Sequence, residues 1–573
     1  MKYRWVQTPH PSEKALEDLR QELKINPILV QLLVQRGITT YDEAKDFFRP
    51  SLKKLHDPFL MLDMDKAVTR INKAIKREEK ILIYGDYDVD GTTAVSLLSS
   101  FLKDHYPNFK TYVPDRYSEG YGVSKQGVDF ARNENISLII ALDCGVKAVD
   151  KVDYALSLGI DFIICDHHLP GDQLPRAVAL LDPKREGCAY PFKELSGCGV
   201  GFKLVQALCS DWGLSYKEWL PLLDLLAVSI GSDIVPITGE NRILAYHGLV
   251  KINTNPRPGF ALLKELAGKK DQKLSIMDVV FMIGPRINAA GRISHGKLAV
   301  DLLTGTDLTK IEADSLTINE QNTERKELDR SITASALDMI EGLKEQERST
   351  TVLYDQKWHK GVIGIVASRL IETYYRPTVV FTESNGKLAG SARSVKGFDI
   401  YKALERCDHI LEQFGGHKYA AGMTLVPEKF EHFKLTFEKV VDELILPEQR
   451  IPVIEIDAEL NLMDIQNGFY KILKQFAPFG PENMNPVFQT NGLVDTGYSS
   501  VVGSDGSHLR VVLRDPDADV SISGIGFGMA DKIELILSGK PVSVVYHLDE
   551  NEYKGRKNLQ LRLKDLRLSE EVS

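Results

Sequence analysis

The sequence predicts a multidomain α/β protein. It comprises a parallel-sheet domain, a long connecting helix, a second α/β domain and a C-terminal all-β domain. The chain has 573 residues, which is more than one hydrophobic core usually organises. From residue 80 onward, short apolar runs alternate with amphipathic segments, a pattern typical of a parallel sheet with crossover helices. After about residue 450, short alternating strands are separated by Asp, Gly and Asn turns, which indicates a small barrel or sandwich.

The first half of the chain is expected to hold a helical cap and the parallel-sheet domain. Residues 1–75 form the cap, because Leu and Ile recur at helical spacing between residues 13 and 75. The parallel-sheet domain covers residues 76–245. Its strands are expected at 81–84, 138–142, 162–165 and 177–181, with helices at 92–103 and 149–158.

The second half is expected to continue through a connector into two further domains. Residues 246–345 form the connector, and the stretch between Gly305 and Gly342 lacks Gly and Pro. A helix of roughly 50 Å fits there at 1.5 Å per residue. The second α/β domain covers 346–447, with strands at 352–354 and 378–382 and a helix at 400–414. The all-β domain covers 448–573, with strands at 509–513 and 559–563.

Composition excludes several classes of protein. Hydrophobic residues make up 43% and charged residues 26%, as in ordinary globular proteins. The net charge of −9 argues against nucleic-acid binding over the whole surface, so any such binding must use a local groove. No apolar run reaches about 18 residues and no leader pattern begins the chain, so a cytoplasmic protein is expected. The six cysteines form no C-x-x-C pair, which favours reduced core thiols over a zinc site.

Acidic and imidazole side chains follow three of the apolar runs in the parallel-sheet domain. The carboxyl ends of parallel strands line one crevice, so these side chains should converge although they lie far apart in sequence. They are Asp86, Asp88, Asp90, Asp143, Asp166, His167 and His168. Alone, D-x-D-x-D-G is usually a turn, Asp143 a helix N-cap and His167-His168 a surface pair. Their joint occurrence at successive strand ends favours a functional site.

Such a cluster calls for cations. Carboxylates this close would repel one another and would stay ionised only with cations between them. Oxygen-rich ligands with one or two imidazoles suit Mn²⁺ or Mg²⁺ better than zinc. Two such ions can activate a water and stabilise the leaving oxygen of a phosphate ester.

These residues resemble the motifs of a known enzyme family. In chain order, residues 84–91, Asp143, Asp166-His167-His168 and Asp233 are similar to the four motifs of the DHH phosphoesterases. Residues 114–116, 119–122 and 284–292 narrow the resemblance to the RecJ family. Residues 390–394 and 415–422 resemble the DHHA1 partner domain, and residues 478–483 open a tail similar to the family's OB-fold. The resemblance covers nearly the whole chain.

The resemblance implies a metal-dependent 5′→3′ exonuclease that hydrolyses phosphodiester bonds of single-stranded DNA in recombination and repair. It implies metal ligands at Asp88, Asp90, Asp143, His167 and Asp233, holding one or two Mn²⁺ or Mg²⁺ ions. His168 would contact the scissile phosphate, with Asp86 and Asp166 completing the catalytic group. Smaller DHH enzymes often have His where Tyr84 stands, so the number of ions stays open.

Substrate-binding residues are expected in both α/β domains. Glycines let backbone N–H groups approach a phosphate, and Arg393 can bind it bidentately, although a tight turn is the alternative. Ser391, Arg393 and Arg116 are expected to grip the terminal 5′ phosphate. Other contacts to the strand are expected from Arg286, Asn288, Arg292, Gly416 and His417, the alternative for the arginines being a solvated helix face. A basic tract at 554–564, beside Tyr553, is expected either to bind single strands or to be a solvated hairpin.

Two other functions remain to be weighed. An oligoribonuclease or nucleotide phosphatase of the same superfamily would lack the N-terminal extension and the OB-like tail. A non-catalytic replication scaffold would have broken metal motifs, whereas here they are filled. The expected partners are single-stranded DNA with a 5′ end, single-strand-binding protein and a helicase, with no membrane association. A monomer is the family expectation.

Overall fold

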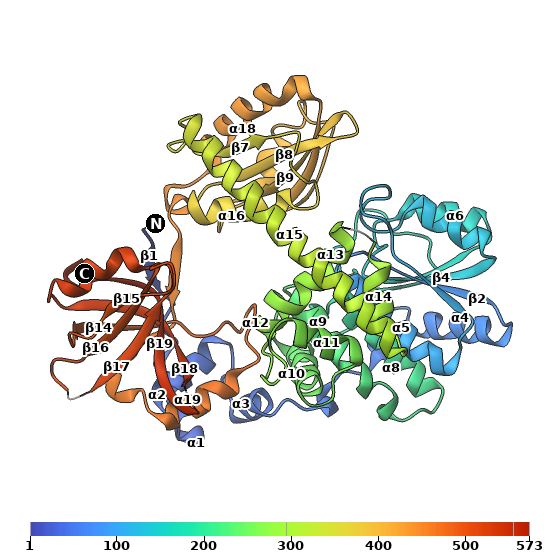
Figure 1. Cartoon of the computed structure of the whole chain (residues 1–573). Coiled ribbons are helices and arrows are strands. Elements are labelled where there is room, and N and C mark those ends of the chain that lie inside the picture. The colour runs from blue at the N-terminus through green and yellow to red at the C-terminus, as the bar shows by residue number, and fades with distance from the viewer. Residues whose placement is uncertain (1, 294, 519, 554, 572–573) are drawn as a thin grey trace. The chain divides into compact units, whose positions relative to one another are not determined.

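The computed structural model describes residues 2–293, 295–518, 520–553 and 555–571 (Figure 1). The chain forms two compact units. Unit 1 comprises Met1–Lys45, Glu327–Phe476 and Asn485–Ser573, and unit 2 comprises Asp46–Lys326 and Ala477–Met484. This division separates residues 1–75, which were expected to form one cap, at Lys45. The strand β1 (Arg4–Gln7) pairs with β12 (Val453–Ile456), which ties the N-terminal segment to unit 1.

Unit 2 is built on a five-stranded parallel sheet in the order β3-β2-β4-β5-β6. The four strands expected from the apolar runs are β2 (Lys80–Gly85), β4 (Ile136–Leu142), β5 (Asp161–Cys165) and β6 (Ala179–Leu181). The strand β3 (Phe109–Tyr112) was not expected. It is a short edge strand with alternating polar residues and half-buried side chains, so it lacks an apolar run.

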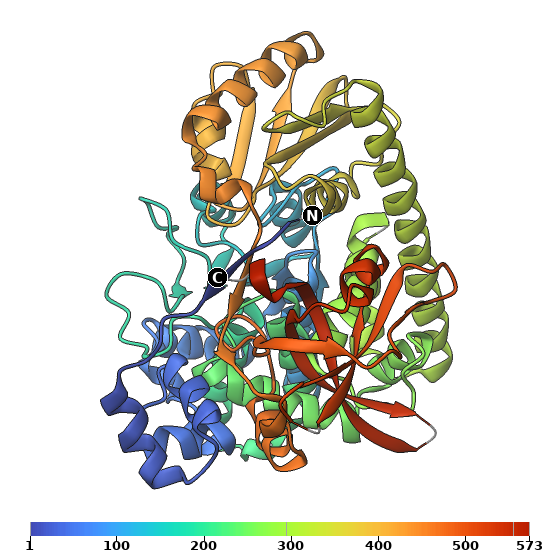
Figure 2. The same cartoon turned by 90° about the vertical axis from the view of Figure 1, so that its left-hand side faces the viewer.

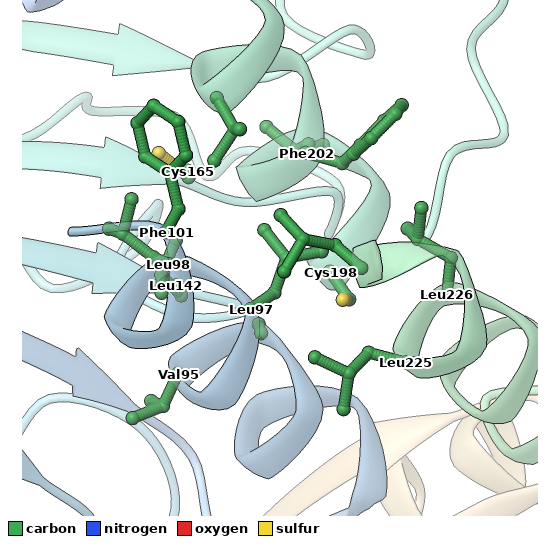
Figure 3. Close-up of a cluster of buried hydrophobic side chains, with 14 of the residues drawn as sticks. Val95, Leu97, Leu98, Phe101, Leu142, Cys165, Cys198, Phe202, Leu225 and Leu226 are labelled. Carbon is green, nitrogen blue, oxygen red and sulfur yellow. The ribbon is translucent and has the colours of Figure 1, made fainter. Parts of the chain in front are cut away.

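Helices cover both faces of this sheet, since alternate strand residues point to opposite faces. Ile81 and Ile83 face a core made with α4 (Met64–Lys76), α5 (Val89–His105), α8 (Gly197–Asp211) and α9 (Leu223–Ser232). Leu82 and Tyr84 face a second core made with α6 (Lys125–Asn133) and α7 (Val149–Ser157). In Figure 3, Leu97 of α5 lies among side chains from the sheet, α8 and α9. This packing fixes the helix starts that surround the strand ends.

Further helices complete unit 2. They are α10 (Gly239–Thr254), α11 (Pro258–Leu266), α12 (Ile276–Asp278), the π-helix η5 (Val279–Ile283), α13 (Gly284–Ile293) and α14 (Lys297–Thr304). The helix α3 (Tyr41–Phe48) belongs to unit 1 up to Lys45 and to unit 2 from Asp46. The expected long helix is α15 (Leu308–Gly342), the long yellow-green ribbon of Figures 1 and 2. Its 35 residues contribute to unit 2 up to Lys326 and to unit 1 from Glu327.

Unit 1 contains a five-stranded mixed sheet in the order β10-β11-β9-β8-β7. Its strands are β7 (Thr351–Tyr354), β8 (Thr378–Ser384), β9 (Lys387–Arg393), β10 (Gln413–His417) and β11 (Ala420–Leu425). Its helices are α16 (Ile363–Thr373), α17 (Ile400–Glu405) and α18 (Phe430–Leu444). The helix expected over 400–414 begins at the predicted residue but is shorter, because α17 ends at Glu405 and β10 begins at Gln413. A Cβ on Gly416 would lie 2.4 Å from the Ala420 carbonyl, so this tight hairpin requires the glycine.

The last part of unit 1 is the expected all-β domain. Its sheet runs β13-β14-β18-β19-β17-β16-β15, and β14 also pairs with β16, which closes a small barrel. The strands are β13 (Ala458–Glu459), β14 (Phe488–Asp495), β15 (Ser500–Val502), β16 (His508–Arg514), β17 (Ser521–Gly526), β18 (Val542–Tyr553) and β19 (Arg556–Leu568). Four helices also belong to unit 1: α1 (Glu13–Leu23), α2 (Pro27–Gln35), α19 (Asn467–Leu473) and α20 (Ile533–Leu537). Within the described residues, no helix combines the length and apolar character needed to cross a bilayer.

Candidate active site

The first acidic motif occupies the turn between β2 and α5. Asp88 is the N-cap of α5 and accepts a hydrogen bond from the Gly91 N–H at 3.0 Å. Asp86 is buried, and its Oδ1 accepts the Gly122 N–H at 3.0 Å. A Cβ on Gly91 would lie 2.4 Å from the Asp86 carbonyl oxygen, so only glycine lets the turn close this tightly. The turn therefore holds both carboxylates at the carboxyl end of the sheet.

Asp90 is held by groups that belong to other helices. Its Oδ2 accepts the Gly197 N–H at 2.6 Å and its Oδ1 accepts the Cys198 N–H at 2.9 Å, both from the first turn of α8. The Ser229 hydroxyl of α9 donates to Oδ1 at 2.7 Å. Backbone N–H groups at a helix start favour a negatively charged or acidic partner, and these three donors hold the Asp90 side chain in place.

His167 lies at the centre of the cluster. Its Nε2 is 3.3 Å from Asp143 Oδ1, 3.5 Å from Asp233 Oδ2 and 3.8 Å from Asp90 Oδ2. Asp143 follows β4 with a φ of 60°, and Asp233 caps the end of α9. The Asp88 carboxyl contacts that of Asp143. The structure thus brings together all five residues for which the sequence predicts metal ligation.

The cluster leaves several buried polar atoms without a hydrogen-bond partner in the described part of the chain. They are Asp86 Oδ2, both carboxylate oxygens of Asp143, both ring nitrogens of His167 and Asp233 Oδ2. Burial, reinforced by neighbouring carboxylates, raises the pKa of Asp86, Asp143 and Asp233 well above the usual range. Buried polar atoms are normally satisfied, so orphans aimed at one point indicate bound cations. Carboxylate oxygens with imidazole nitrogens fit Mn²⁺ or Mg²⁺.

His168 is held by Asp166 and faces outward. Asp166 Oδ1 accepts hydrogen bonds from His168 Nδ1 at 2.7 Å and from the His167 N–H at 2.8 Å. Its Oδ2 accepts the Val146 N–H at 2.9 Å. Burial acts to raise the pKa of Asp166, but the hydrogen bond from His168 outweighs it and the pKa is lowered. Burial acts to lower the pKa of His168, and Asp166 reverses that effect and raises it.

An aromatic series that the sequence did not predict leads from His168 to Arg116. The Tyr121 hydroxyl lies 3.4 Å from His168 Nε2, and the Tyr121 ring packs edge-on against Tyr87 at 5.8 Å. The Arg116 guanidinium lies 5.0 Å from the centre of the Tyr87 ring. Tyr121 belongs to the 119–122 segment that resembles the family. An aromatic residue in a glycine-rich turn does not by itself predict a contact with the active site.

In unit 1, Ser391 and Arg393 lie side by side at the start of α16. An Arg393 guanidinium nitrogen donates to Ser391 Oγ at 3.0 Å. A Cβ on Gly364, in the first turn of α16, would lie 2.8 Å from that guanidinium and 2.9 Å from Ser391 Oγ. Gly416 and His417 lie on β10, which pairs with β11, the neighbour of β9. A helix start beside an arginine and a hydroxyl suits a phosphate.

The three predicted residues on α13 differ in their surroundings. Arg286 is 8% exposed and donates to Asn319 Oδ1, to the Met282 carbonyl and to the Leu266 carbonyl. Arg286 therefore joins α13 to α15 and α11, and these contacts stabilise the packing of the helices. Asn288 is half-buried, and so is Arg292, whose carbonyl accepts the Tyr117 hydroxyl.

The basic tract of the barrel is partly ion-paired. Lys557 lies 3.0 Å from Glu550. Arg562 lies 5.6 Å from the ring centre of the exposed Phe527, which packs edge-on against His508. Lys554 and the side chain of Tyr553 lie outside the described residues. Lys557 thus fits the alternative of a solvated hairpin. Arg562, Phe527 and His508 form a basic and aromatic group on the barrel.

Comparisons with known proteins agree with this architecture. Three family models match: the DHH family N-terminal domain over residues 80–230, the DHHA1 domain over 347–443 and the RecJ OB domain over 456–565. The single-stranded-DNA-specific exonuclease RecJ of Bacillus subtilis is 36% identical, over 99% of this chain and 71% of that protein. The same enzyme of Escherichia coli is 33% identical, over 95% and 96%. The crystal structure of Thermus thermophilus RecJ in complex with Mn²⁺ matches with a TM-score of 0.85 and 26% identity, covering 98% of this chain and 79% of that one.

Proposed function

Since the chain belongs to the RecJ family of single-stranded-DNA-specific exonucleases, we propose that it removes nucleotides from the 5′ end of single-stranded DNA. The reaction is metal-dependent hydrolysis of phosphodiester bonds, and it serves DNA recombination and repair. One observation carries the proposal: the unsatisfied oxygens and nitrogens of Asp143, His167 and Asp233 converge at the carboxyl end of a parallel sheet.

The residues of the site have separate proposed roles. Asp88, Asp90, Asp143, His167 and Asp233 would hold one or two Mn²⁺ or Mg²⁺ ions, which would activate a water and stabilise charge on the phosphate. Asp166 orients His168 so that Nδ1 carries a proton and Nε2 faces the substrate. The raised pKa of His168 favours the imidazolium, which can donate to a phosphate oxygen. Asp86, held by the Gly122 N–H, supports the neighbouring carboxylates.

We assign the terminal 5′ phosphate to the group formed by Ser391, Arg393 and the start of α16 in unit 1. The contact expected from Arg116 stays a prediction. Gly416 and His417 are assigned to the same strand path. Of the α13 residues, Asn288 and Arg292 suit contact with the strand, whereas the buried Arg286 positions α13. This assignment rests on the pairing of Arg393 with Ser391 beside a helix start.

Replacing Arg393 tests the phosphate assignment. Arg393→Ala should reduce the preference for 5′-phosphorylated over 5′-hydroxyl ends by about 10-fold or more, because a bidentate charge-assisted pair is lost. The preference of Arg393→Lys should lie between those of wild type and Arg393→Ala, since lysine keeps the positive charge but lacks the planar guanidinium. The measurement is kcat/KM on the two oligonucleotides, with Arg369→Ala on the far end of α16 as a control. A preference unchanged in Arg393→Ala refutes the assignment.

The function itself is tested with single-stranded DNA labelled at its 3′ end. Wild type and Asp143→Ala would be incubated with Mn²⁺, with Mg²⁺ and with chelator, beside a blunt duplex and a dinucleotide. A ladder shortening from the 5′ end, absent with chelator, in the variant and on the duplex, supports the proposal. Cleavage of the dinucleotide alone indicates an oligoribonuclease, and binding without cleavage indicates a scaffold.

We infer further that the chain works in the cytoplasm with a helicase and a single-strand-binding protein, and acts as a monomer. An enzyme that requires single strands needs an unwinding activity to expose them. The barrel with its exposed Phe527 and Arg562 suits a second contact to the strand. Addition of a helicase should make a duplex degradable, and a duplex that stays intact would contradict this inference.

A further inference from the structure

Ile234, directly after the metal ligand Asp233, has a backbone conformation that is unfavourable for its side chain. The helix α9 ends with Asp233 as C-cap, its N–H bonded to the Ser229 carbonyl at 2.9 Å. Ile234 then takes a φ of 60°. At this position after a helix, the left-handed conformation is usually filled by glycine, sometimes by asparagine. A β-branched residue there is a genuine outlier.

No other β-branched residue of the described chain has this conformation. The remaining non-glycine residues with positive φ are Lys24, Asp63, Glu78, Asn135, Asp143, Lys344, Asn385 and Glu482. These are Asn and Asp, which tolerate the region, or long unbranched side chains. Selection for backbone geometry alone would therefore place Gly or Asn at position 234.

Packing within the chain does not account for the isoleucine either. Its side chain is 67% exposed, whereas Val235 and Ile237, which follow it, are buried in the core. Ile237 N–H is bonded to the Pro481 carbonyl, and the Asn241 side chain donates to the Pro236 carbonyl. The segment is thus anchored on both sides of Ile234, which is how a strained residue persists. The isoleucine side chain itself gains little from the fold.

The position of Ile234 indicates what its side chain meets. Its Cα is about 3.8 Å from that of Asp233, and Asp233 Oδ2 lies 3.5 Å from His167 Nε2. A phosphate bound at this cluster would bring its nucleoside close to the turn that carries Ile234. An uncharged branched side chain cannot recognise the phosphate, but it can pack against the apolar surface of a sugar or base.

We propose that Ile234 is a substrate-specificity residue that packs against the nucleoside of the 5′-terminal nucleotide and orients it at the scissile bond. The inference rests on the proposed function. Contact of this kind is present in both the ground state and the transition state, so it acts on KM more than on kcat.

The test uses Ile234→Gly and Ile234→Asn, which relieve the backbone strain and remove the apolar branched side chain. Ile234→Val keeps the strained backbone and an apolar branched side chain. Glu78→Gly is a matched control, since Glu78 follows the C-cap of α4 with a φ of 56°, before β2 begins. KM for single-stranded DNA should rise about 10-fold in the Gly and Asn variants, the low end of the effect of a lost apolar contact. It should stay within about 2-fold of wild type in the Val variant and in Glu78→Gly.

Two measurements without DNA separate this role from a structural one. Calorimetric Mn²⁺ affinity should match wild type in every variant, and the unfolding midpoint of Ile234→Gly should be no lower than that of wild type. A wild-type KM in both the Gly and Asn variants would overturn the proposal, and so would a parallel loss of Mn²⁺ affinity. Failure of wild type to degrade single-stranded DNA would instead refute the proposed function.

An oligonucleotide whose 5′-terminal nucleotide is abasic identifies the part of the nucleoside contacted. If Ile234 packs on the base, removing the base should cost wild type more than it costs Ile234→Gly. If Ile234 packs on the sugar, the two changes should add, as independent perturbations do. The first result places the contact on the base. Additivity places it on the sugar when KM is also raised in the Gly and Asn variants, and additivity with a wild-type KM overturns the proposal.

Discussion

Replacing Gly197 by alanine should damage the metal centre through a contact that the structure defines closely. A Cβ at position 197 would lie 2.5 Å from Asp143 Cβ, 2.5 Å from its Oδ1 and 2.7 Å from its Cα. Ordinary contact begins near 3.4 Å, so Asp143 and the start of α8 would have to separate by about 1 Å. Asp143 cannot swing aside, because its backbone and Cβ are part of the contact.

The shift would displace two of the proposed ligands together, since the Gly197 N–H also donates to Asp90 Oδ2 at 2.6 Å. A misplacement of about 1 Å at a catalytic group typically lowers the rate about 100-fold. Overpacking of a tight site should also lower the free energy of unfolding by about 1–3 kcal/mol. Gly197→Ala should therefore bind Mn²⁺ weakly and degrade DNA about 100-fold more slowly.

Gly199→Ala is the matched control, because Gly199 also lies in the first turn of α8, two residues after Gly197. Its Cβ would lie 3.3 Å from Ser196 Oγ and 3.4 Å from Leu195 Cβ, so little has to move. Alanine is also favoured over glycine in a helix by about 1 kcal/mol. Calorimetric Mn²⁺ affinity, kcat on single-stranded DNA and urea unfolding would be compared for the two variants. Equal Mn²⁺ affinity and kcat in Gly197→Ala and Gly199→Ala would show that the argument from the close approach is mistaken.

Three further outcomes are expected. Mn²⁺ at 100 times its Kd should stabilise the protein by about 2.7 kcal/mol, because it relieves repulsion among buried carboxylates; an unfolding temperature insensitive to chelator would contradict this. Lys203→Met should cost about 3–5 kcal/mol in urea unfolding, because Lys203 Nζ lies 2.6 Å from the fully buried Glu240; a loss below about 1 kcal/mol would contradict it. Burial raises the pKa of Asp182 to about 7. Wild type should therefore lose stability as pH rises from about 4 to about 7, because Asp182 ionises in the unfolded chain but stays protonated in the folded one. After a discount for solvent screening, Asp182→Asn should gain about 2 kcal/mol relative to wild type at pH 8 compared with pH 4, and a gain independent of pH would refute this account.

The convergence of acidic and imidazole side chains at strand ends was predictable because it depends on local pattern. A buried strand shows as an apolar run, and parallel strands end at a common edge, so Asp90, Asp143 and His167 could be placed together before any distance was known. Asp233 follows a helix instead of a strand. Its role came from family resemblance, and the structure places it 3.5 Å from His167 Nε2.

Other parts of the site carried no such signal. The groups that hold Asp90 are two backbone N–H groups of α8 and the Ser229 hydroxyl, and any sequence offers such donors in abundance. Gly364 resembles many helix glycines until its closeness to Arg393 is seen. The helix predicted over 400–414 extends too far, into the first two residues of β10, because the hairpin that follows depends on the close approach of Gly416 to the next strand.

The sequence by itself determined the order of domains, the sheet with its acidic edge, the long helix and the closing all-β domain, because periodicity and strand-end residues are local properties. Tertiary structure alone decided that Arg286 is buried between helices, that Gly197 lies against Asp143 and that Ile234 is exposed in a strained conformation beside Asp233. These depend on contacts between segments distant in the chain, or on a turn anchored from both sides, and no local pattern encodes either.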